Sequence, residues 1–311
     1  TVDEAIQAAH RAYRQLHTHS VEERGRFISA IRACAVEESE QISYMAVKES
    51  QMGRASDKIL KNMAAALNSP GIEDLDKSCW SGDKGLTLVE RGAYGVIGSI
   101  TPTTNPTETI ICNSIGMISA GNAVFFSPHP TAKETSLYTI RAINAAIIKA
   151  GGPTNLLTAV AEPSIDAANQ MMSHPLVRML VATGGPGVVQ AVLSSGKKAI
   201  GAGAGNPPVI VDQTADIPKA ARDIVAGASF DNNLPCVAEK ELIVIGSVAD
   251  ELKAHMRKAG AYLASPQELQ KLEKLLLVQG ENGHLGASKN YIGRDALVIL
   301  KAIGVEAPAG T

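Results

Sequence analysis

The chain has 311 residues, 45% of them hydrophobic and 4% aromatic, and a formal net charge of −2 at pH 7. This length accommodates two domains with a large core, and the near-neutral charge argues against a nucleic-acid-binding surface. The four cysteines are widely spaced without a CxxC pair, which argues against a zinc site or a disulfide framework and favours a reducing, cytoplasmic compartment. They are Cys34, Cys79, Cys112 and Cys236.

No membrane span is predicted from the sequence. The most apolar region, residues 109–126, is interrupted by Asn113, Ser114, Ser119 and Asn122, so it is typical of a helix followed by a strand. The first residue is Thr1, and no signal-peptide pattern follows it. We therefore expect the sequence to be a piece of a longer chain.

The N-terminal part, residues 2–67, has a helical pattern. A capping box, Ser20 to Glu23, opens a second helix whose apolar stripe includes Cys34, which is therefore predicted to lie in the core. Cys112 is a second cysteine that we expect in the core. The polar residues 70–85 are expected to form a loop, and residues 87–91 a strand.

Short apolar runs then alternate with helical patterns as far as residue 245. Repeated βα units with nearly continuous apolar strands predict a parallel, doubly wound α/β sheet, which binds ligands beyond the carboxyl ends of its strands. The expected strands are Gly95–Ile100, Ala123–Phe126, Leu156–Val160, Met179–Ala182, Lys198–Ile200, Val209–Val211 and Leu242–Ile245. The helices between them are expected at Glu108–Ile118, Ala132–Ala150, Ile165–Ser173, Gly187–Ser194 and Ile217–Ala228.

The last part of the chain predicts helices at Val248–Leu263, Pro266–Val278 and Asp295–Ile303, with a Gly-rich loop over residues 280–286. We expect a first domain over residues 1–235, with the N-terminal helices and a Rossmann-like nucleotide-binding fold. Residues 236–311 are expected to form an incomplete α/β catalytic domain, because they are only about half of the ~150 residues of a usual domain.

Cys236 is the candidate nucleophile. It follows a polar turn and Pro235 and precedes a strand, so backbone geometry holds it where it can face a cleft. The alternative is a small buried apolar residue, which is the usual environment of a free cysteine.

Three loops at strand ends are candidate ligand sites. Asn105, before a helix, can donate a hydrogen bond to an oxyanion, or it can be a helix cap. The run Thr183-Gly184-Gly185 offers backbone N–H groups to a phosphate or lets a flat ring approach. Gly203 lies in a glycine-rich run that allows close approach of a ligand, or forms a tight connection between strands.

Together these motifs resemble the aldehyde dehydrogenase superfamily, and within it the CoA-acylating propionaldehyde or acetaldehyde dehydrogenases of propanediol- and ethanolamine-utilising microcompartments. The resemblance rests on Thr-Pro…Asn-Pro (101–106), Ser-Pro-His-Pro (127–130), Thr-Gly-Gly-Pro-Gly (183–187), Gly-Ala-Gly-Ala-Gly-Asn-Pro-Pro (201–208) and Ser-Phe-Asp-Asn-Asn-Leu-Pro-Cys (229–236). It implies oxidation of a short-chain aldehyde to acyl-CoA with NAD and coenzyme A.

The resemblance also implies roles for individual residues. Cys236 would be the nucleophile, and Asn105 would form the oxyanion hole with the backbone N–H of Cys236. No metal is implied. The residues implied in cofactor binding are Thr101, Pro102, Thr103, Ser127, His129, Thr183, Gly184, Gly185 and Gly203. Hydrolytic members usually carry a lysine in the region of Ser127 and His129, so the choice between NAD and NADP stays open.

One departure from the hydrolytic pattern favours acyl transfer. Where hydrolytic members have Glu-Leu-Gly-Gly-Lys, this chain has Gly-Ala-Gly-Ala-Gly (201–205). Gly201 therefore stands in place of the glutamate that deprotonates water. A thiol ionises near pH ~8.5, so CoA supplies part of its own thiolate. The alternatives are a hydrolytic or phosphorylating semialdehyde dehydrogenase and a non-catalytic nucleotide-binding fragment.

The resemblance implies partners and a location as well. Family members continue past residue 311, and we expect a homo-oligomer at full length, because the missing part holds a strand used in oligomerisation. Microcompartment shell or lumen proteins are further expected partners. The expected location is the cytoplasm or the lumen of a bacterial microcompartment.

Overall fold

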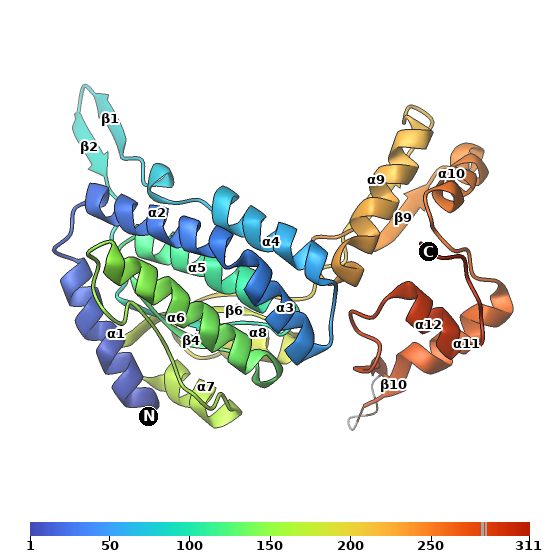
Figure 1. The fold of residues 1–311 in the computed structure, drawn as a ribbon. Helices are drawn as coiled ribbons and strands as arrows, with labels where there is room; N and C mark the ends of the chain where they lie inside the picture. The colour runs from blue at the N-terminus through green and yellow to red at the C-terminus, as the bar shows by residue number, and fades with distance from the viewer. Residues whose placement is uncertain (281–282, 284) are drawn as a thin grey trace. The chain divides into compact units, whose positions relative to one another are not determined.

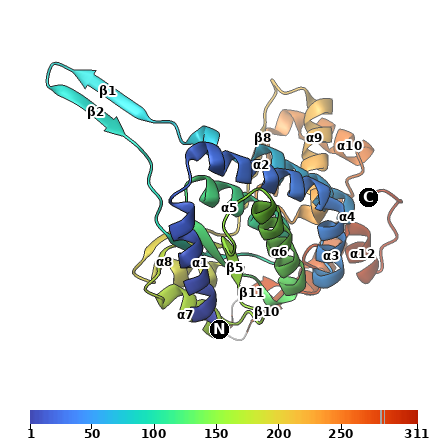
Figure 2. The same cartoon turned by 60° about the vertical axis from the view of Figure 1, so that its left-hand side comes forward.

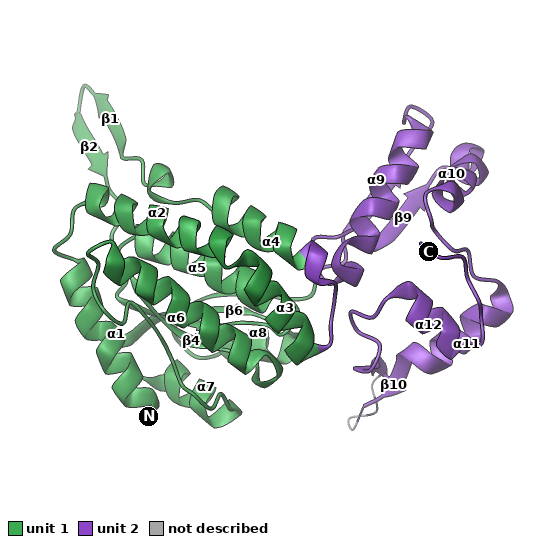
Figure 3. Ribbon diagram, in the orientation of Figure 1, with its two compact units in different colours: residues 1–50, 58–204 green, residues 51–57, 205–311 purple. Residues whose placement is uncertain are grey.

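The computed structural model describes residues 1–280, 283 and 285–311. These residues form two compact units, residues 1–50 with 58–204 and residues 51–57 with 205–311 (Figure 3). Part of the predicted Gly-rich loop, residues 281, 282 and 284, lies outside the described residues. The units divide at residues 204/205, and the domain boundary at 235/236 stays a prediction.

The first unit contains a five-stranded parallel sheet with the order β5-β4-β3-β6-β7 (Figures 1 and 2). Val, Ile and Phe side chains fill β3 and β4, and nearly every residue of these two strands is buried, because helices cover both faces of the sheet. The strands are β3 (Val96–Ile100), β4 (Ala123–Ser127), β5 (Leu157–Ala159), β6 (Val177–Thr183) and β7 (Lys198–Ala202). The predicted α/β fold and these five strands are confirmed.

Two helical layers cover this sheet. One layer contains α5 (Pro106–Ser119) and α6 (Lys133–Lys149), on which α2 (Val21–Glu37) and α3 (Ser39–Ser50) pack. Helix α4 (Ala55–Asn68) joins this layer through hydrogen bonds and an ion pair with α2, α3 and α5. The other contains α1 (Val2–Leu16), α7 (Ile165–Ser173) and α8 (Pro186–Leu193). The short 3₁₀ helices of this unit are η1 (Ile72–Asp74) and η2 (Pro130–Ala132).

The prediction of a loop over residues 70–85 is wrong in part. Residues Ser78–Gly82 form β1, which pairs antiparallel with β2 (Gly85–Val89) in a hairpin. All ten paired residues are exposed, so β1 shows none of the alternating burial by which a strand is normally detected in a sequence.

In the second unit, β8 (Pro208–Val211) and β9 (Glu241–Val244) pair with each other in a separate two-stranded parallel sheet. The expectation that these two strands belong to the same parallel sheet as the other five is therefore wrong. Pro207, which lacks a backbone N–H group, lies between β7 and β8, and Pro208 is the first residue of β8. Around this pair lie α9 (Ile217–Ser229), η3 (Phe230–Asn233) and α10 (Gly246–Lys258).

The C-terminal elements are α11 (Pro266–Leu276), the antiparallel pair β10 (Leu277–Gln279) and β11 (Leu285–Ala287), and α12 (Ala296–Ala302). The predicted helix Val248–Leu263 ends earlier, at Lys258, since Gly260 has a positive φ of 106°. No helix in the described part of the chain is long and apolar enough to cross a membrane.

Candidate active site

The predicted cofactor residues gather at one edge of the five-stranded sheet. Thr101, Pro102 and Thr103 follow β3, Ser127 ends β4, Thr183 ends β6, and Gly203 follows β7. These strands are parallel, so their carboxyl ends lie at the same edge. The chain leaves β3 for β4 on one side and returns as β6 on the other, which is the topological switch point where open α/β sheets bind ligands.

Backbone hydrogen bonds hold these strand ends level with one another. The N–H of Thr101 donates to the carbonyl of Ser127 at 3.2 Å, and the N–H of Gly184 donates to the carbonyl of Ala202 at 3.1 Å. The hydroxyl oxygen of Thr101 is buried without a hydrogen-bond partner among the described residues. A polar atom in this position is consistent with a ligand-binding edge.

The loop after β4 is held by Thr131, which the sequence did not single out. Its hydroxyl lies 2.8 Å from the hydroxyl of Thr103 and 2.8 Å from Nδ1 of His129. The backbone N–H of Thr131 also donates to Nδ1 of His129 at 3.2 Å. Nδ1 of His129 therefore accepts from this N–H and lies within hydrogen-bond distance of the Thr131 hydroxyl.

Lys133, which follows this loop in the sequence, is engaged elsewhere. Nζ of Lys133 donates to both carboxylate oxygens of Glu162, at 3.0 and 3.1 Å. These bonds raise the pKa of Lys133 above its ordinary value. The charge of Lys133 is therefore already paired with a carboxylate.

The start of α8 is suited to a phosphate. Gly185 is the N-cap and makes no side-chain cap, and Pro186 occupies the first helical position. A Cβ added to Gly185 or Gly187 would meet no atom within 4 Å, so open space lies against this backbone. Exposed N–H groups at a helix start bind anions, and the glycines therefore fit a dinucleotide.

The start of α6 is different, because a carboxylate already occupies it. Oε1 of Glu49 accepts from the N–H of Glu134 at 2.9 Å, and Oε2 accepts from the N–H and the hydroxyl of Thr135 at 2.9 and 2.7 Å. These bonds satisfy N–H groups that a phosphate would otherwise use. Of these two helix starts, the one at α8 is therefore the better anion site.

Asn105 is the N-cap of α5, but its side chain makes no capping hydrogen bond. Its Oδ1 accepts from Nζ of Lys61 at 2.6 Å, and its Nδ2 donates to the hydroxyl of Thr104 at 3.1 Å. The alternative role of Asn105 as a side-chain cap is therefore not realised. Lys61 was not singled out from the sequence, because a helical lysine is normally a solvated surface residue.

Cys236 lies in the second unit and is exposed, so it is not the buried apolar cysteine of the alternative interpretation. Three consecutive residues before it, Asp231, Asn232 and Asn233, have positive φ angles of 47°, 52° and 60°. Such conformations cost energy for residues other than glycine and persist where the surroundings hold them.

Arg54 supplies much of that support. Its backbone N–H donates to the carboxylate of Asp231 at 2.8 Å, and its Nε donates to Oδ1 of Asn232 at 2.8 Å. The N–H of Asp231 in turn donates to the carboxylate of Asp57 at 2.8 Å. The side-chain amide of Asn233 donates to the carbonyls of Ala228 and Glu239, at 2.7 and 3.0 Å.

The backbone of Cys236 is packed against Gly205. A Cβ added to Gly205 would lie 2.0 Å from the carbonyl oxygen of Cys236, which no side chain tolerates. On the other side, Nζ of Lys240 donates to the carbonyls of Asn233 and Pro235, each at 3.2 Å. Desolvation lowers the pKa of Lys240, and the negative charges of a Cys236 thiolate and of a nearby carboxylate oppose that shift.

Gly201 lies in β7. A Cβ at this position would lie 2.7 Å from Cγ1 of Val189 in α8, so a side chain here requires that Val189 shift. As a glycine, residue 201 offers no carboxylate base.

The other cysteines differ from the prediction in one case. Cys34 is half-buried, and burial raises its pKa to about 11. Cys112, which was expected in the core, is exposed on α5, and its sulfur accepts a hydrogen bond from the hydroxyl of Ser69 at 3.0 Å. Cys79 is exposed in β1.

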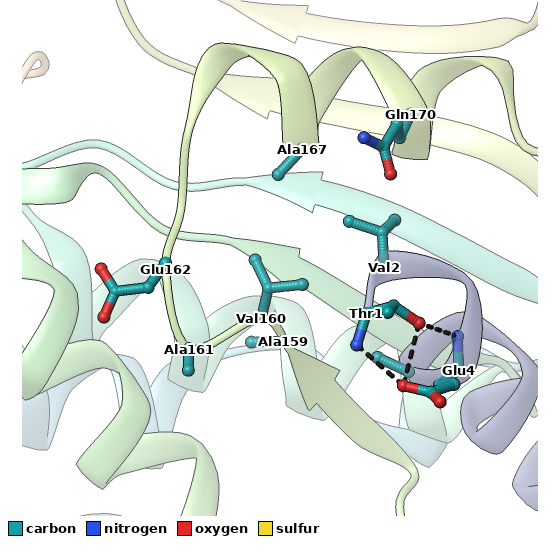
Figure 4. A pocket seen from close by; sticks show the side chains of 10 residues that line it. Thr1, Val2, Glu4, Ala159, Val160, Ala161, Glu162, Ala167 and Gln170 are labelled. Carbon is teal, nitrogen blue, oxygen red and sulfur yellow. Dashed lines mark hydrogen bonds and ion pairs between the residues drawn. The ribbon is translucent and has the colours of Figure 1, made fainter.

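A surface hollow lies elsewhere on the first unit (Figure 4). The start of α1, the loop after β5 and one side of α7 line it, with Val2, Val160 and Gln170 around the opening. The polar groups of Thr1 and Glu4 bond to each other in a capping box. None of the predicted site residues is among those that line this hollow.

Comparison with known proteins gives consistent matches. The model of the aldehyde dehydrogenase family matches residues 1–271. The CoA-propanoylating propanal dehydrogenase of Salmonella typhimurium is 48% identical over 309 residues, which are 99% of this chain and 66% of that protein. The chain thus spans about two thirds of the length of this curated relative.

Two solved structures are similar over nearly the whole chain. Propionaldehyde dehydrogenase from Rhodopseudomonas palustris, with bound CoA and an acylated cysteine, has a TM-score of 0.95 and 52% identity, and covers 100% of this chain and 70% of that one. A propionaldehyde dehydrogenase from the fucose utilisation microcompartment of Clostridium phytofermentans has a TM-score of 0.94 and 49% identity, with 99% and 70% covered.

Proposed function

Since the chain belongs to the aldehyde dehydrogenase family, we propose that it catalyses the oxidation of a short-chain aldehyde, propionaldehyde or acetaldehyde, to acyl-CoA with NAD and CoA. The observation that carries the proposal is the exposed Cys236 on a loop that hydrogen bonds hold in a costly conformation. The relative with an acylated cysteine and bound CoA supports the same chemistry.

In the proposed mechanism, the thiolate of Cys236 attacks the aldehyde carbon, and the carbonyl oxygen becomes an oxyanion. An N–H of Asn105 and the backbone N–H of Cys236 donate to that oxyanion. Bound NAD would accept the hydride that leaves this carbon. Cys236 then carries the acyl group as a thioester. The thiolate of CoA attacks the thioester, and the Cys236 thiolate leaves as the C–S bond breaks.

The carboxyl-end edge of the five-stranded sheet would hold the dinucleotide. The pyrophosphate would lie at Gly184 and Gly185, and the adenosine ribose at Ser127 and His129. We favour NAD over NADP because Nδ1 of His129 is engaged by Thr131 and the charge of Lys133 is paired with Glu162. A 2′-phosphate would have to compete with the carboxylate of Glu162 for Lys133. The ratio of kcat/KM for NAD and NADP measures this preference.

A product assay tests the proposal on the protein at its natural length. NADH formation from propionaldehyde should require CoA, and propionyl-CoA should appear in equal amount. Cys236→Ser should lower the rate by at least about 10³-fold, because the nucleophile is lost. Cys79→Ser, which changes another exposed thiol, should leave it unchanged.

Each alternative gives a different result in the same assay. Free acid without CoA would support a hydrolytic enzyme, and acyl phosphate with inorganic phosphate a phosphorylating one. No turnover, together with alkylation of Cys236 by iodoacetamide no faster than that of Cys79, would support a non-catalytic nucleotide-binding fragment.

We further propose a homo-oligomer that resides in a microcompartment lumen. The hairpin β1–β2 exposes Trp80, Leu86 and Leu88, which is unusual for a free surface, and one relative comes from a microcompartment. Light scattering of the purified protein and fractionation of intact compartments would test the two statements separately.

A further inference from the structure

We propose that Lys61 is a positioning residue for the reaction, which acts by fixing the orientation of the Asn105 side-chain amide. This inference rests on the proposed function, in which an N–H of Asn105 donates to the oxyanion. It concerns how the chain keeps that N–H available.

Two lysines of α4 reach the loop that follows β3. Nζ of Lys58 donates to the carbonyl of Thr104 at 3.1 Å, and Nζ of Lys61 donates to Oδ1 of Asn105 at 2.6 Å. Lys58 is only 1% exposed, and the side chain of Lys61 is 10% exposed. Such burial is rare for lysine, so these side chains are held in place by their contacts with the loop and its surroundings.

The ammonium group decides which way the amide faces. An ammonium has three donors and no acceptor, whereas an amide presents an acceptor on one side and two donors on the other. Oδ1 must therefore face Lys61, and the NH₂ group must face away from it. One of its two N–H donors bonds to the hydroxyl of Thr104, and the second makes no hydrogen bond with the described residues, so it is available to a ligand.

The positive charge of Lys61 is balanced one turn along α5. Its Nζ lies 3.0 Å from Oε1 of Glu108, whose side chain is also 10% exposed. A buried ammonium without such a partner would be costly. Glu108 therefore allows Lys61 to stay charged where it contacts Asn105.

A charged donor on Oδ1 has a second effect. Charge-assisted hydrogen bonds are stronger than neutral ones, and in a dry environment linked hydrogen bonds polarise one another. Withdrawal of electron density from Oδ1 makes the amide N–H a better donor. Loss of Lys61 would allow the Asn105 side-chain amide to rotate by 180°, and would make its N–H group a weaker hydrogen-bond donor.

A double-mutant cycle on the protein at its natural length distinguishes a Lys61 that acts through Asn105 from a Lys61 that only pairs with Glu108. The rate of hydride transfer in a single turnover is measured for Lys61→Met, Asn105→Ala and the double variant. We expect Lys61→Met to lower the rate about tenfold with Asn105 present, and by less than about twofold when Asn105 is already alanine. Affinity for NAD should not change.

Further variants test the same inference if Lys61→Met folds poorly. Lys61→Met combined with Glu108→Gln removes the carboxylate charge left unpaired, and should show the same dependence on Asn105. Lys61→Arg keeps a donor-only cation, and should retain more of the rate than Lys61→Gln, whose amide can also accept.

Lys197→Met is the matched control. Nζ of Lys197 donates to the carbonyls of His174 and Val177, at the amino end of β6 and so at the opposite end of that strand from Thr183. It should lower stability without lowering the rate.

Three results have distinct meanings. If the effects of Lys61→Met and Asn105→Ala multiply, Lys61 does not act through the amide and the inference fails. If Lys197→Met lowers the rate as much as Lys61→Met, the loss reflects general destabilisation and the inference also fails. If Asn105→Ala leaves the rate unchanged, the oxyanion role in the proposed function is wrong, and the role of Lys61 is overturned with it.

Discussion

The loops that carry Asn105 and Cys236 are fixed by different means. The Asn105 loop, residues 101–105, has no residue with a positive φ and is held by buried lysines of α4, so side-chain charge fixes it. The Cys236 loop follows three left-handed residues, and its cysteine is exposed. The backbone conformation of that run fixes the loop, supported by contacts with Arg54 and with the side-chain amide of Asn233.

The difference matches the work proposed for each residue. An oxyanion donor gains from a dry, charged environment in which its orientation is set before reaction. A nucleophile must be reached by an aldehyde and then by CoA, so it cannot be buried. Its loop must therefore be held by contacts that leave the thiol accessible. Substitutions in the first loop should therefore change mainly rate, and substitutions in the second should change stability as well.

Among the substitutions that leave the Cys236 thiol in place, the largest effect is expected from Asn105→Ala. Loss of one oxyanion donor should lower kcat by about 10²-fold, with a smaller change in KM, because the bond strengthens in the transition state. Steady-state kinetics with propionaldehyde, NAD and CoA measure it. Asn113→Ala is the control, since Asn113 lies on the same helix and donates to the hydroxyl of Ser99 at 3.0 Å. An unchanged kcat in Asn105→Ala would remove the distinction between the loops.

The sequence predicted the role of the Asn105 loop better than it predicted the lysines that hold this loop in place. Asn105 stands out because it precedes a proline at the end of an apolar strand. Lys58 and Lys61 do not, because lysines three residues apart on a helix are typical of a solvated face. Only the packing of α4 on the larger sheet's helical layer shows that these two are buried.

Strands were predictable where burial determines them. The runs around Val96–Ile100 and Ala123–Ser127 are apolar because both faces of β3 and β4 are covered. Strand β1 has no buried face, so nothing in Ser-Cys-Trp-Ser-Gly distinguishes it from a loop. The pairing of β8 with β9 depends on contacts between residues far apart in sequence, which local patterns do not contain.

A smaller effect on rate is expected from Gly205→Ala. The new Cβ would lie 2.0 Å from the carbonyl oxygen of Cys236, so the backbone that carries the thiol must move. We expect kcat/KM to fall by at least about tenfold and the free energy of unfolding to fall by about 1–3 kcal/mol.

The control for Gly205→Ala is Gly246→Ala, at the first residue of α10. A Cβ there would meet no atom within 4 Å, and alanine favours a helix. Kinetics and urea unfolding on both variants separate a local displacement of Cys236 from a general effect of alanine. Equal results for the two would show that the close approach of Gly205 is unimportant.

The smallest effect on rate, and a clear effect on stability, is expected from Asn232→Val. Valine at a φ of 52° is strained by its branched Cβ, and the variant also loses the hydrogen bonds of Asn232 with Arg54 and with the carbonyl of Gly293. Asn155→Val is the matched control, since Asn155 has a φ of 63° but no side-chain hydrogen bond within the described part of the chain.

Both valine variants should lose about 1–2 kcal/mol of unfolding free energy from backbone strain. Asn232→Val should lose about a further 1 kcal/mol or more from its missing hydrogen bonds, and only it should slow acylation of Cys236. Urea unfolding and alkylation of Cys236 by iodoacetamide measure the two quantities. If the two variants lose the same stability and Cys236 reacts equally fast in both, the hydrogen bonds of Asn232 do not stabilise the left-handed residues. The bond from Arg54 to Asn232 then contributes nothing to the position of the thiol.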